Sequence, residues 1–368
     1  MRIERIELFH VAMPLVRPFR TSLGAWDTVE SVLVKMTSGG LSGWGESAPG
    51  SVPDYCPEYA AGAFALIRDV LAPRLLGGDL ASGEQLQQAL AGIRGNRFAK
   101  AALDLAWWDL HARRLDRPLW KLLGGQSPTV RVGADLGVQD SLERLGELVD
   151  AAVADGFPRL KLKIEPGRDV DVVAAVRETH PDLTVHVDGN SAYSLADVDL
   201  FRRLDDFGLA MIEQPLANDD LIDHAELRRQ VRTPICLDES IDSPAAAAKA
   251  IRIGACDWIN IKHGRVGGVT AALAIHDLCR AAGVGNWIGG MLESAVGQAF
   301  ATALATLDNV RYPSDIFPSS RFYAADLGDP PLVLAGAGLA AAAEAPGIAA
   351  APHPARLVER TSQHAVIQ

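Results

Sequence analysis

With 368 residues, 48% of them hydrophobic and 22% charged, the chain has the composition of a folded globular protein with a large core. Acidic residues outnumber basic ones by 46 to 35, and the net charge of -11, without a dense run of Lys or Arg, argues against nucleic acid or an anionic membrane surface as the main partner. Residues 1–20 carry charges every few positions and no apolar stretch of signal-peptide or transmembrane length, so we expect a cytoplasmic protein.

The start of the chain predicts a mixed α+β region. Residues 3–15 and 30–47 have the pattern of strands with glycine-rich turns. Residues 60–77 and 99–125 have the spacing of amphipathic helices, and both segments end at glycine, a common left-handed stop. We therefore expect residues 1–125 to form one small α+β domain.

From about residue 129 the chain alternates between short apolar runs and helical stretches. The apolar runs lie at residues 129–138, 159–164, 183–188, 209–215, 234–240, 257–262, 286–291 and 309–313. One helix between them is clearly bounded, because Ser243 suits its N-cap, Pro244 its first position and Gly254 its end. Eight such units in roughly 200 residues predict an α/β fold, a TIM-type barrel, over residues 126–327.

The last part of the chain, residues 328–368, is rich in Ala, Gly and Pro. It shows no clear helical or strand period. We expect a mostly irregular return segment that packs on the N-terminal domain.

Charged residues end five consecutive predicted strands. They are Lys163, Asp188, Glu213, Asp238 and Lys262, and subtraction of their numbers gives intervals of 25, 25, 25 and 24 residues, one βα unit each time. The active site of such a barrel lies at the C-terminal ends of the strands. We therefore expect the five side chains at one level around the mouth of the barrel.

Three of these five side chains are carboxylates, which repel one another when they are desolvated around one small mouth. A divalent cation resolves the conflict, and all-oxygen ligands favour a hard ion. We therefore expect Mg2+ bound by Asp188, Glu213 and Asp238. Each acid alone could instead be a helix cap or a solvated strand end, but three in register between two lysines favour the metal site.

The segment LKLKIEP, residues 160–166, places Lys161 and Lys163 two positions apart on a predicted strand, so both ammonium groups share one face. If that face points into the barrel, burial and the nearby Lys161 would lower the pKa of Lys163 toward the ~7–8 that suits a general base. Lys161 would then tune the pKa of Lys163 and position it, while Lys163 would transfer protons. The alternative is an edge strand whose lysines reach solvent along an apolar surface.

The motifs KLKIEPG, VDGN, IEQPL, CLDES and NIKHGRVGG, in this order and spacing, resemble those of the enolase superfamily. The closer resemblance is to its muconate lactonizing enzyme-like subgroup, in the branch of o-succinylbenzoate synthases and N-acylamino acid racemases. MPLVRPFRTS, GWGE and RFY extend the resemblance over nearly the whole chain. It implies an α+β capping domain over a modified (β/α)7β barrel, acid/base lysines Lys163 and Lys262, Mg2+ with Mn2+ as a substitute, and a homo-oligomer.

The resemblance also implies a chemistry, the removal of a proton α to a carboxylate of a small molecule through an ene-diolate that Mg2+ stabilises. In o-succinylbenzoate synthesis for menaquinone, the activity we expect first, Lys163 would take the proton and return it to the departing hydroxyl. Lys262 would face the intermediate as a cation. In racemisation of an N-acylamino acid, which the same site could support, the two lysines would act from opposite faces. The alternatives are an N-acylamino acid racemase or dipeptide epimerase as the main activity, or another acid-sugar or carboxylate lyase or cycloisomerase of the superfamily.

By the same resemblance, substrate contacts are expected from both domains. The residues are Phe19, Arg20, Leu23 and Tyr55 of the capping domain, and Asp135, Asn190, Arg265, Met291 and Glu293 of the barrel. Phe19, Leu23 and Tyr55 could instead be ordinary packing or surface residues, and Arg265 a surface arginine in a loop before a helix.

Four positions depart from the pattern of the branch. His263 stands where proline is usual after the catalytic lysine, and Ser294 and Gln298 stand where Thr and Arg are more common. Asp135 replaces a small polar residue on the first strand that is expected to approach the substrate. An acid there would repel a succinyl carboxylate or attract an amine, which weakens the o-succinylbenzoate assignment. Alternatively, Asp135 faces the capping domain and has no role.

Overall fold

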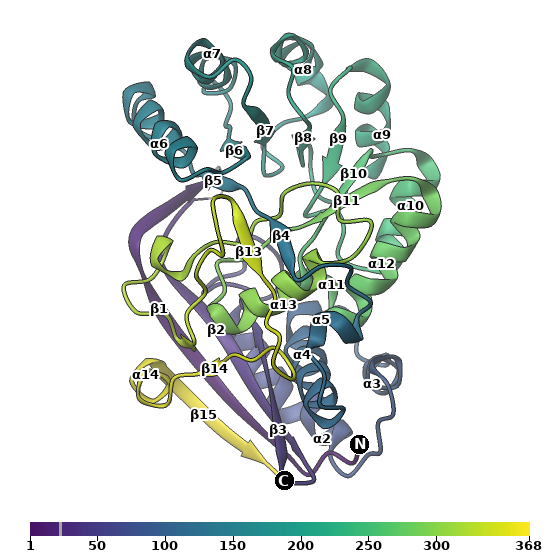
Figure 1. The fold of residues 1–368 in the computed structure, drawn as a ribbon. Coiled ribbons are helices and arrows are strands. Elements are labelled where there is room, and N and C mark those ends of the chain that lie inside the picture. Colours follow the sequence, from purple (N-terminus) through teal and green to yellow (C-terminus); the bar gives the residue numbers. More distant parts are fainter. Residues whose placement is uncertain (22–23) are drawn as a thin grey trace.

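The computed structural model describes residues 1–21 and 24–368, so the predicted substrate contact Leu23 lies outside the described residues. The N-terminal part is an antiparallel sheet in the order β15-β1-β2-β3, with helices packed against it (Figure 1). Its strands are β1 (Arg5–Thr21), β2 (Gly24–Ser38), β3 (Leu41–Ser47) and β15 (Thr361–Ile367). Its helices are α1 (Ala60–Leu66) with the π-helical η1 (Ile67–Leu71), α2 (Ala72–Leu75), α3 (Gly83–Leu90), α4 (Arg97–Arg114) and α5 (Leu119–Leu122). The α+β cap is confirmed.

Two glycines of β3 allow the sheet to approach helix α4. A Cβ atom at Gly43 would lie 2.3 Å from the backbone nitrogen of Leu110, and one at Gly45 would lie 2.4 Å from the backbone oxygen of Ala102. A larger residue at either position would push the helix away, because backbone atoms cannot yield as a flexible side chain can. The close contact fixes β3, and with it Glu46, against the rest of the protein.

The second part is a curled parallel sheet in the order β11-β10-β9-β8-β7-β6-β5, with helices on its outer side (Figure 1). Its strands are β5 (Ala134–Leu136), β6 (Arg159–Lys163), β7 (Thr184–Asp188), β8 (Ile212–Glu213), β9 (Ile235–Leu237), β10 (Trp258–Ile261) and β11 (Gly285–Ile288). The main helices are α6 (Leu142–Ala154), α7 (Val170–Thr179), α8 (Val198–Leu204), α9 (Leu221–Gln230), α10 (Pro244–Ile253), α11 (His263–Val266), α12 (Val269–Ala282) and α13 (Ala295–Ala305). Short 3-10 turns are η2 (Leu195–Asp197), η3 (Asp205–Phe207) and η4 (Ser319–Arg321). The modified barrel under an N-terminal cap is confirmed.

The eighth strand position differs from the prediction. Residues 309–313 were expected to form a strand, but this part of the chain makes only isolated parallel bridges, Asn286 with Val310 and Val132 with Ser314. Proline has no N–H to donate to a ladder, which disfavours a regular strand through Pro313. The prediction of eight regular strands was therefore wrong, and the seam between β11 and β5 is closed by side chains as well as by backbone.

Helix α10 begins and ends as its sequence predicts. The Ser243 hydroxyl oxygen accepts a hydrogen bond from the Ala246 N–H at 3.2 Å, and Pro244 is the first helical residue. Gly254 ends the helix with φ of 70°, the left-handed region that glycine tolerates. Local capping chemistry therefore sets both ends of this helix.

The end of the chain has more regular structure than predicted. It holds β12 (Gly328–Asp329), β13 (Leu339–Ala341), β14 (Ala351–Pro352), α14 (Pro354–Arg360) and β15. Strand β13 pairs with β4 (Thr129–Arg131), and β15 pairs antiparallel with β1, with Ile367 opposite Ile6. β15 is an edge strand, and its exposed Ser362 and Gln363 obscure the alternation of polar and apolar residues that marks a strand.

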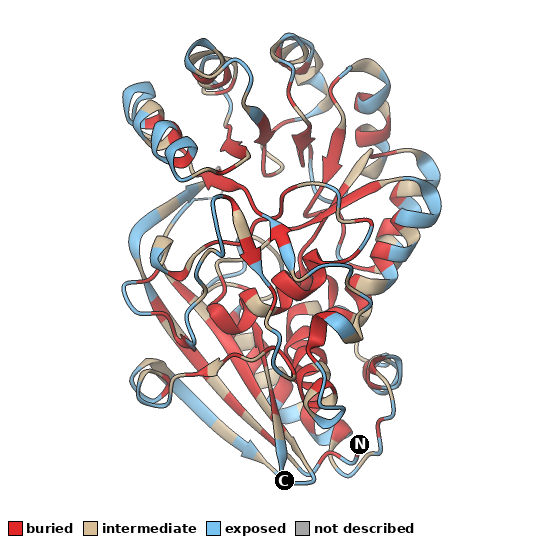
Figure 2. Ribbon diagram, in the orientation of Figure 1, coloured by how far each residue is buried: buried red, intermediate tan, exposed pale blue. Residues whose placement is uncertain are grey.

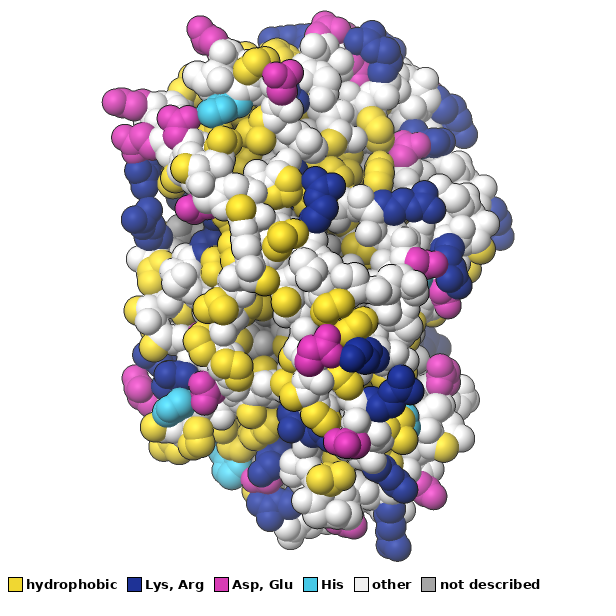
Figure 3. Space-filling view, viewed as in Figure 1, with side chains coloured by type: hydrophobic (Ala, Val, Ile, Leu, Met, Phe, Trp, Pro, Cys, Tyr) yellow, Lys and Arg dark blue, Asp and Glu magenta, His cyan; other side chains and the backbone are white. Residues whose placement is uncertain are grey.

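Buried residues occupy the barrel strands and the face of the cap sheet that meets α4, while the outer barrel helices are exposed on one side (Figure 2). On the face seen in Figure 3, acidic and basic side chains are interspersed around the rim. Over the described ranges, we find no helix with the length and apolar character needed to cross a membrane.

Glu46 joins the two domains. Its buried carboxylate accepts hydrogen bonds from the backbone N–H groups of Ser294 and Gly297, at 3.1 and 3.0 Å, and thereby caps the start of α13. The hydroxyl of Ser31 also donates to it at 3.0 Å. Burial raises the pKa of Glu46 to about 7, against the lowering effect of the Ser294 hydrogen bonds.

Replacing Glu46 with glutamine is expected to change how stability depends on pH. The folded state binds a proton up to about pH 7, whereas the unfolded state loses it near the ordinary pKa of 4.5. Glu46 therefore contributes stability below pH 4.5 that is lost as the pH rises to about 7, by up to roughly 3 kcal/mol. Urea unfolding at several pH values between 4.5 and 8 should show a smaller decline for Glu46→Gln than for the wild type. Parallel curves for the two proteins would contradict this account.

Candidate active site

The charged strand ends lie side by side in the sheet. Lys163 and Asp188 are register partners at the ends of β6 and β7, and Asp188 is the partner of Glu213 at the end of β8. Asp238 and Lys262 follow directly after β9 and β10. The 25-residue intervals therefore place Lys163, Asp188 and Glu213 in register. Asp238 lies two residues beyond Cys236, which is the register partner of Glu213. In strand order, the three carboxylates lie between the two lysines.

These residues adjoin a cavity of about 120 Å³ between the barrel mouth and the cap. Its polar lining includes Lys161, Lys163, Lys262, Asn190, Asp135 and Asp315. Its apolar wall includes Phe19, Trp26 and Val29 of the cap and Met291, Leu292 and Phe317 of the barrel. The cavity thus combines an apolar wall with a few charged and polar side chains, the usual composition of a small-molecule site.

Lys163 does not have the lowered pKa that was predicted. Burial does lower it, but the Asp188 carboxylate 2.5 Å from its Nζ, together with Asp135, outweighs burial and raises the pKa of Lys163 above its ordinary value. The prediction considered burial and Lys161 but not this ion pair across the strands. In this arrangement Lys163 is an ammonium group.

Lys262, at the other side of the mouth, is held by residues from both domains. Its Nζ lies 2.8 Å from the Asp238 carboxylate and donates to the Tyr55 hydroxyl at 3.2 Å. Burial opposes the charge, but Asp238 raises the pKa of Lys262 above its ordinary value. Arg265 also donates to Asp238 and to Tyr55, and it is buried, so the surface alternative for this arginine was wrong.

Glu213, the middle carboxylate, is surrounded by neutral donors as well as by Lys161. Asn260 donates to it at 2.7 Å, and His186 lies 3.3 Å from it. Burial, followed by the charge of Arg159, lowers the pKa of His186 well below its ordinary value, so this imidazole is neutral. Burial also raises the pKa of both Glu213 and Asp188, and the negative charge of neighbouring acids adds to the effect.

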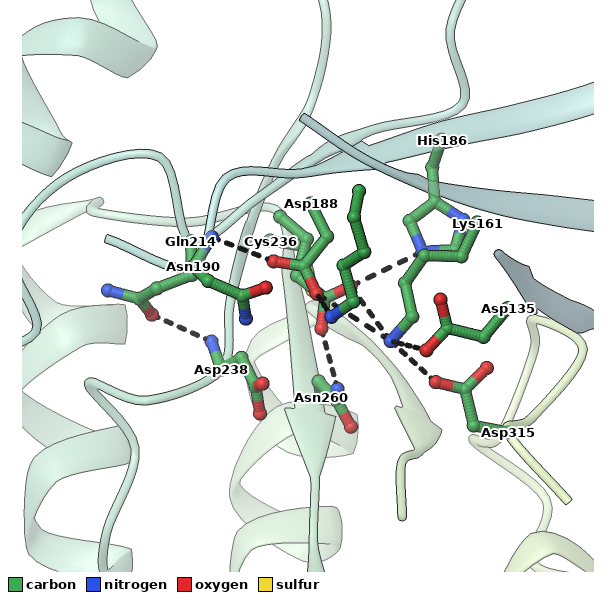
Figure 4. Close-up of polar contacts among 12 residues, drawn as sticks. Asp135, Lys161, His186, Asp188, Asn190, Gln214, Cys236, Asp238, Asn260 and Asp315 are labelled. Carbon is green, nitrogen blue, oxygen red and sulfur yellow. Dashed lines mark hydrogen bonds and ion pairs between the residues drawn. The ribbon is translucent and has the colours of Figure 1, made fainter. Parts of the chain in front are cut away.

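Lys161 is anchored by a pair of residues that the sequence prediction missed. Its Nζ lies 2.6 Å from Asp315, and the other oxygen of Asp315 accepts a hydrogen bond from Arg159 at 2.5 Å. Arg159 also donates to the carbonyl oxygens of Pro313 and Ala134, and so fills the seam where a regular eighth strand is lacking. Figure 4 shows Asp315 and Asp135 approaching Lys161 from one side and Asp188 from the other. Arg159, Lys161 and Lys163 alternate along β6, a spacing that could have identified Arg159.

The three carboxylates form a donor set whose chemistry fits a divalent cation. Over the described residues, no three His, Cys, Asp or Glu side chains converge on a single metal-binding point. Asp188 pairs with Lys163, Asp238 pairs with Lys262, and Glu213 accepts a hydrogen bond from Asn260. All three carboxylates are nevertheless fully buried at the ends of adjacent strands. Desolvated oxygen ligands of like charge fit a hard cation such as Mg2+.

The predicted substrate contacts divide into two groups. Phe19, Tyr55, Asp135, Asn190 and Met291 line the cavity. Arg20 is exposed and pairs with Asp140, while the buried Glu293 accepts hydrogen bonds from the Met291 N–H and the Gln298 side chain, at 2.8 and 3.1 Å. Glu293 thus holds the loop that carries Met291.

Comparisons with known families account for both parts of the chain. Residues 4–124 match the N-terminal domain model of mandelate racemase and muconate lactonizing enzyme, and residues 144–356 match the enolase C-terminal domain-like model. Together these models span more than half of the sequence.

The chain belongs to the enolase superfamily. This superfamily member is 46% identical over 349 residues to an o-succinylbenzoate synthase of Geobacillus kaustophilus, covering 95% of this chain and 93% of the relative. It is also 46% identical over 327 residues to an N-succinylamino acid racemase of Thermus thermophilus, covering 89% of each chain. A dipeptide epimerase of Cytophaga hutchinsonii, whose crystal structure holds Mg and the dipeptide D-Ala-L-Val, superimposes with a TM-score of 0.92 at 25% identity and full coverage of both chains.

Three of the four residues of this enzyme that depart from the pattern of the branch are buried and do not line the cavity. His263 is buried near Phe300 at the start of α11, and burial lowers the pKa of its imidazole. Ser294 caps α13 and donates to Glu46, while Gln298 donates to Glu293. The fourth unusual residue, Asp135, lines the cavity and does not merely face the cap.

Proposed function

We propose that the protein is an o-succinylbenzoate synthase that also racemises N-acylamino acids, and that both reactions begin with removal of a proton α to a carboxylate. One observation carries the proposal. Lys163 and Lys262 line the same cavity from strands on either side of the three strands that bear Asp188, Glu213 and Asp238. A substrate carbon between them is accessible to an acid/base group on each face.

We further propose that Asp188, Glu213 and Asp238 hold Mg2+. A bound Mg2+ supplies positive charge next to the substrate carboxylate, where negative charge develops as the α proton leaves. Asp188 and Asp238 are also the carboxylates that raise the pKa of Lys163 and Lys262. When these carboxylates share their charge with a cation, they hold the lysine protons less tightly, which favours the basic form of each lysine.

In the elimination, Lys163 removes the α proton from the cyclohexadiene carboxylate precursor and transfers it to the departing hydroxyl. The C–H and C–O bonds break, a C=C bond forms, and water leaves. Lys262 remains an ammonium group that faces the negative charge of the intermediate. In racemisation, one lysine removes the α proton and the other donates a proton to the opposite face.

The experiment that tests this assignment is a competition between the two substrates. Dehydration of the cyclohexadiene carboxylate should be catalysed, and an N-succinylamino acid should inhibit it competitively with an inhibition constant equal to its own KM for racemisation. Racemisation without dehydration would overturn the synthase assignment. A racemase as the main activity is the second candidate, and the acid at position 135 favours it.

Replacing Asp238 with asparagine is expected to weaken Mg2+ binding. The amide keeps one oxygen ligand but removes a negative charge, so the loss should exceed the roughly 10–100-fold that removing an outer-sphere partner costs. Isothermal titration of the full-length protein with Mg2+ measures the change. The matched control is Asp199→Asn, whose side chain is 88% exposed on a barrel helix and should leave the affinity unchanged. An unaltered Mg2+ affinity in Asp238→Asn would exclude Asp238 as a ligand of the metal.

A further inference from the structure

Asp135 lies at the centre of the short strand β5, opposite Lys161 of β6 in parallel register. Its side chain is only 8% exposed, and it lines the cavity together with Lys161 and Lys163. Its backbone oxygen accepts a hydrogen bond from Arg321 at 2.5 Å, which helps to fix the strand. The pairing with β6 and the Arg321 hydrogen bond therefore hold the strand, and with it the carboxylate, beside the two lysines.

The two oxygens of Asp135 lack the partners that the neighbouring acids have. Oδ2 lies 3.6 Å from the Lys161 ammonium, beyond normal hydrogen-bond distance. Oδ1 is buried and accepts no hydrogen bond from any of the described residues. Figure 4 shows one oxygen of Asp135 directed to Lys161 and the other turned away from it.

The two other carboxylates that line the cavity, Asp315 and Asp54, each have a partner for both oxygens. Asp315 pairs with Lys161 at 2.6 Å and with Arg159 at 2.5 Å. Asp54 accepts hydrogen bonds from the Trp26 indole and from the Tyr55 backbone, at 3.1 and 2.8 Å. Since Asp315 already neutralises Lys161, Asp135 is not needed for that purpose. A buried acceptor without a donor costs about 1–3 kcal/mol, so a donor on the bound substrate would be recognised at this position.

We propose that Asp135 is a specificity-determining residue that accepts a hydrogen bond from an N–H group of the substrate next to its reacting carbon. This inference rests on the proposed function and narrows it, because the amide of an N-acylamino acid carries such an N–H and the cyclohexadiene carboxylate does not. Replacing N–H by oxygen at this point removes the donor and places a lone pair against the carboxylate. The residue therefore directs this site toward N-acylamino acids.

The test compares an N-succinylamino acid with its ester isostere, in which oxygen replaces the amide N–H. The Mg2+-loaded wild type and the variants Asp135→Ala and Asp135→Asn are incubated in D2O, and kcat/KM for α-deuteration is measured by proton NMR. The ratio of amide to ester should be roughly 10–100-fold higher for the wild type than for Asp135→Ala. Asp135→Asn retains an acceptor oxygen and should give an intermediate ratio of amide to ester. This variant also tests the assignment if Asp135→Ala fails to fold. Asp182→Ala, at an exposed position before β7, should keep the wild-type ratio.

The isostere ratio separates recognition from a merely structural role. If Asp135 only positioned Lys161, both substrates would lose kcat equally, the ratio would stay constant across the variants, and the assignment would be overturned. A wild type that deuterates neither substrate would overturn the proposed function and this assignment with it. If the wild type and Asp135→Ala are both active and have the same amide-to-ester ratio of kcat/KM, the assignment of Asp135 is overturned but the proposed function is not.

Discussion

Lys163→Ala is expected to abolish dehydration and racemisation together. Lys163 is the only side chain proposed to take the α proton in the elimination, and general acid–base groups of this kind contribute about 10²–10⁴-fold to the rate. Alanine cannot take a proton, and it also leaves Asp188 without the ammonium that lies 2.5 Å from it. Steady-state dehydration and racemisation assays of the Mg2+-loaded variant measure the loss.

Deuterium exchange makes the test of Lys163 sharper. Because Lys262 remains on the opposite face, Lys163→Ala should exchange the α proton of only one enantiomer of an N-succinylamino acid, without racemising it. Lys249→Ala, at an exposed position on α10, is the matched control and should retain both activities. Dehydration at the wild-type rate in Lys163→Ala would remove the assignment of this lysine as the base.

Of the substitutions proposed for this protein, Arg159→Ala is expected to lower the free energy of unfolding the most. The guanidinium is fully buried and donates to Asp315 and to the carbonyl oxygens of Pro313 and Ala134. It also lies over the rings of Trp287 and Tyr312, at 5.3 and 5.5 Å. Removing one partner of a buried ion pair costs about 3–5 kcal/mol, because the acceptors left behind lose their donor.

Urea unfolding measures the effect of Arg159→Ala on the free energy of unfolding. Arg229→Ala is the matched control, since its side chain is 64% exposed and pairs with Glu226 on the surface, where such pairs contribute roughly 0–1 kcal/mol. The kcat of Arg159→Ala should also fall, because Asp315 then loses the group that fixes it beside Lys161. A loss of stability no larger than that of Arg229→Ala would contradict the anchoring role.

The spacing of the strand ends was the part of the site most accessible from sequence. A parallel barrel repeats at a nearly constant interval, so residue numbers alone placed Lys163, Asp188 and Glu213 at one level, as the strand register confirms. The same alternation along β7 places His186 on the face of Asp188, and this was overlooked.

Other features depend on contacts between distant segments and gave no local signal. Asp315 lies two residues after the predicted eighth run, residues 309–313, in a segment that forms only isolated bridges, yet it is the nearest carboxylate to Lys161. The predicted direction of the pKa shift of Lys163 was wrong, because the prediction considered burial but not the ion pair with Asp188. Edge strand β15 was missed because four of its seven residues are exposed.

The measurement that tests the central claim most directly is proton NMR of the Mg2+-loaded protein in D2O with each enantiomer of an N-succinylamino acid and, in parallel, the cyclohexadiene carboxylate precursor of o-succinylbenzoate. The account predicts loss of the α-proton signal from both enantiomers with convergence to a racemic mixture, and conversion of the cyclohexadiene carboxylate to the aromatic product with release of water. Retention of every α-proton signal and of the intact precursor would contradict the claim that this site removes a proton α to a carboxylate in these substrates.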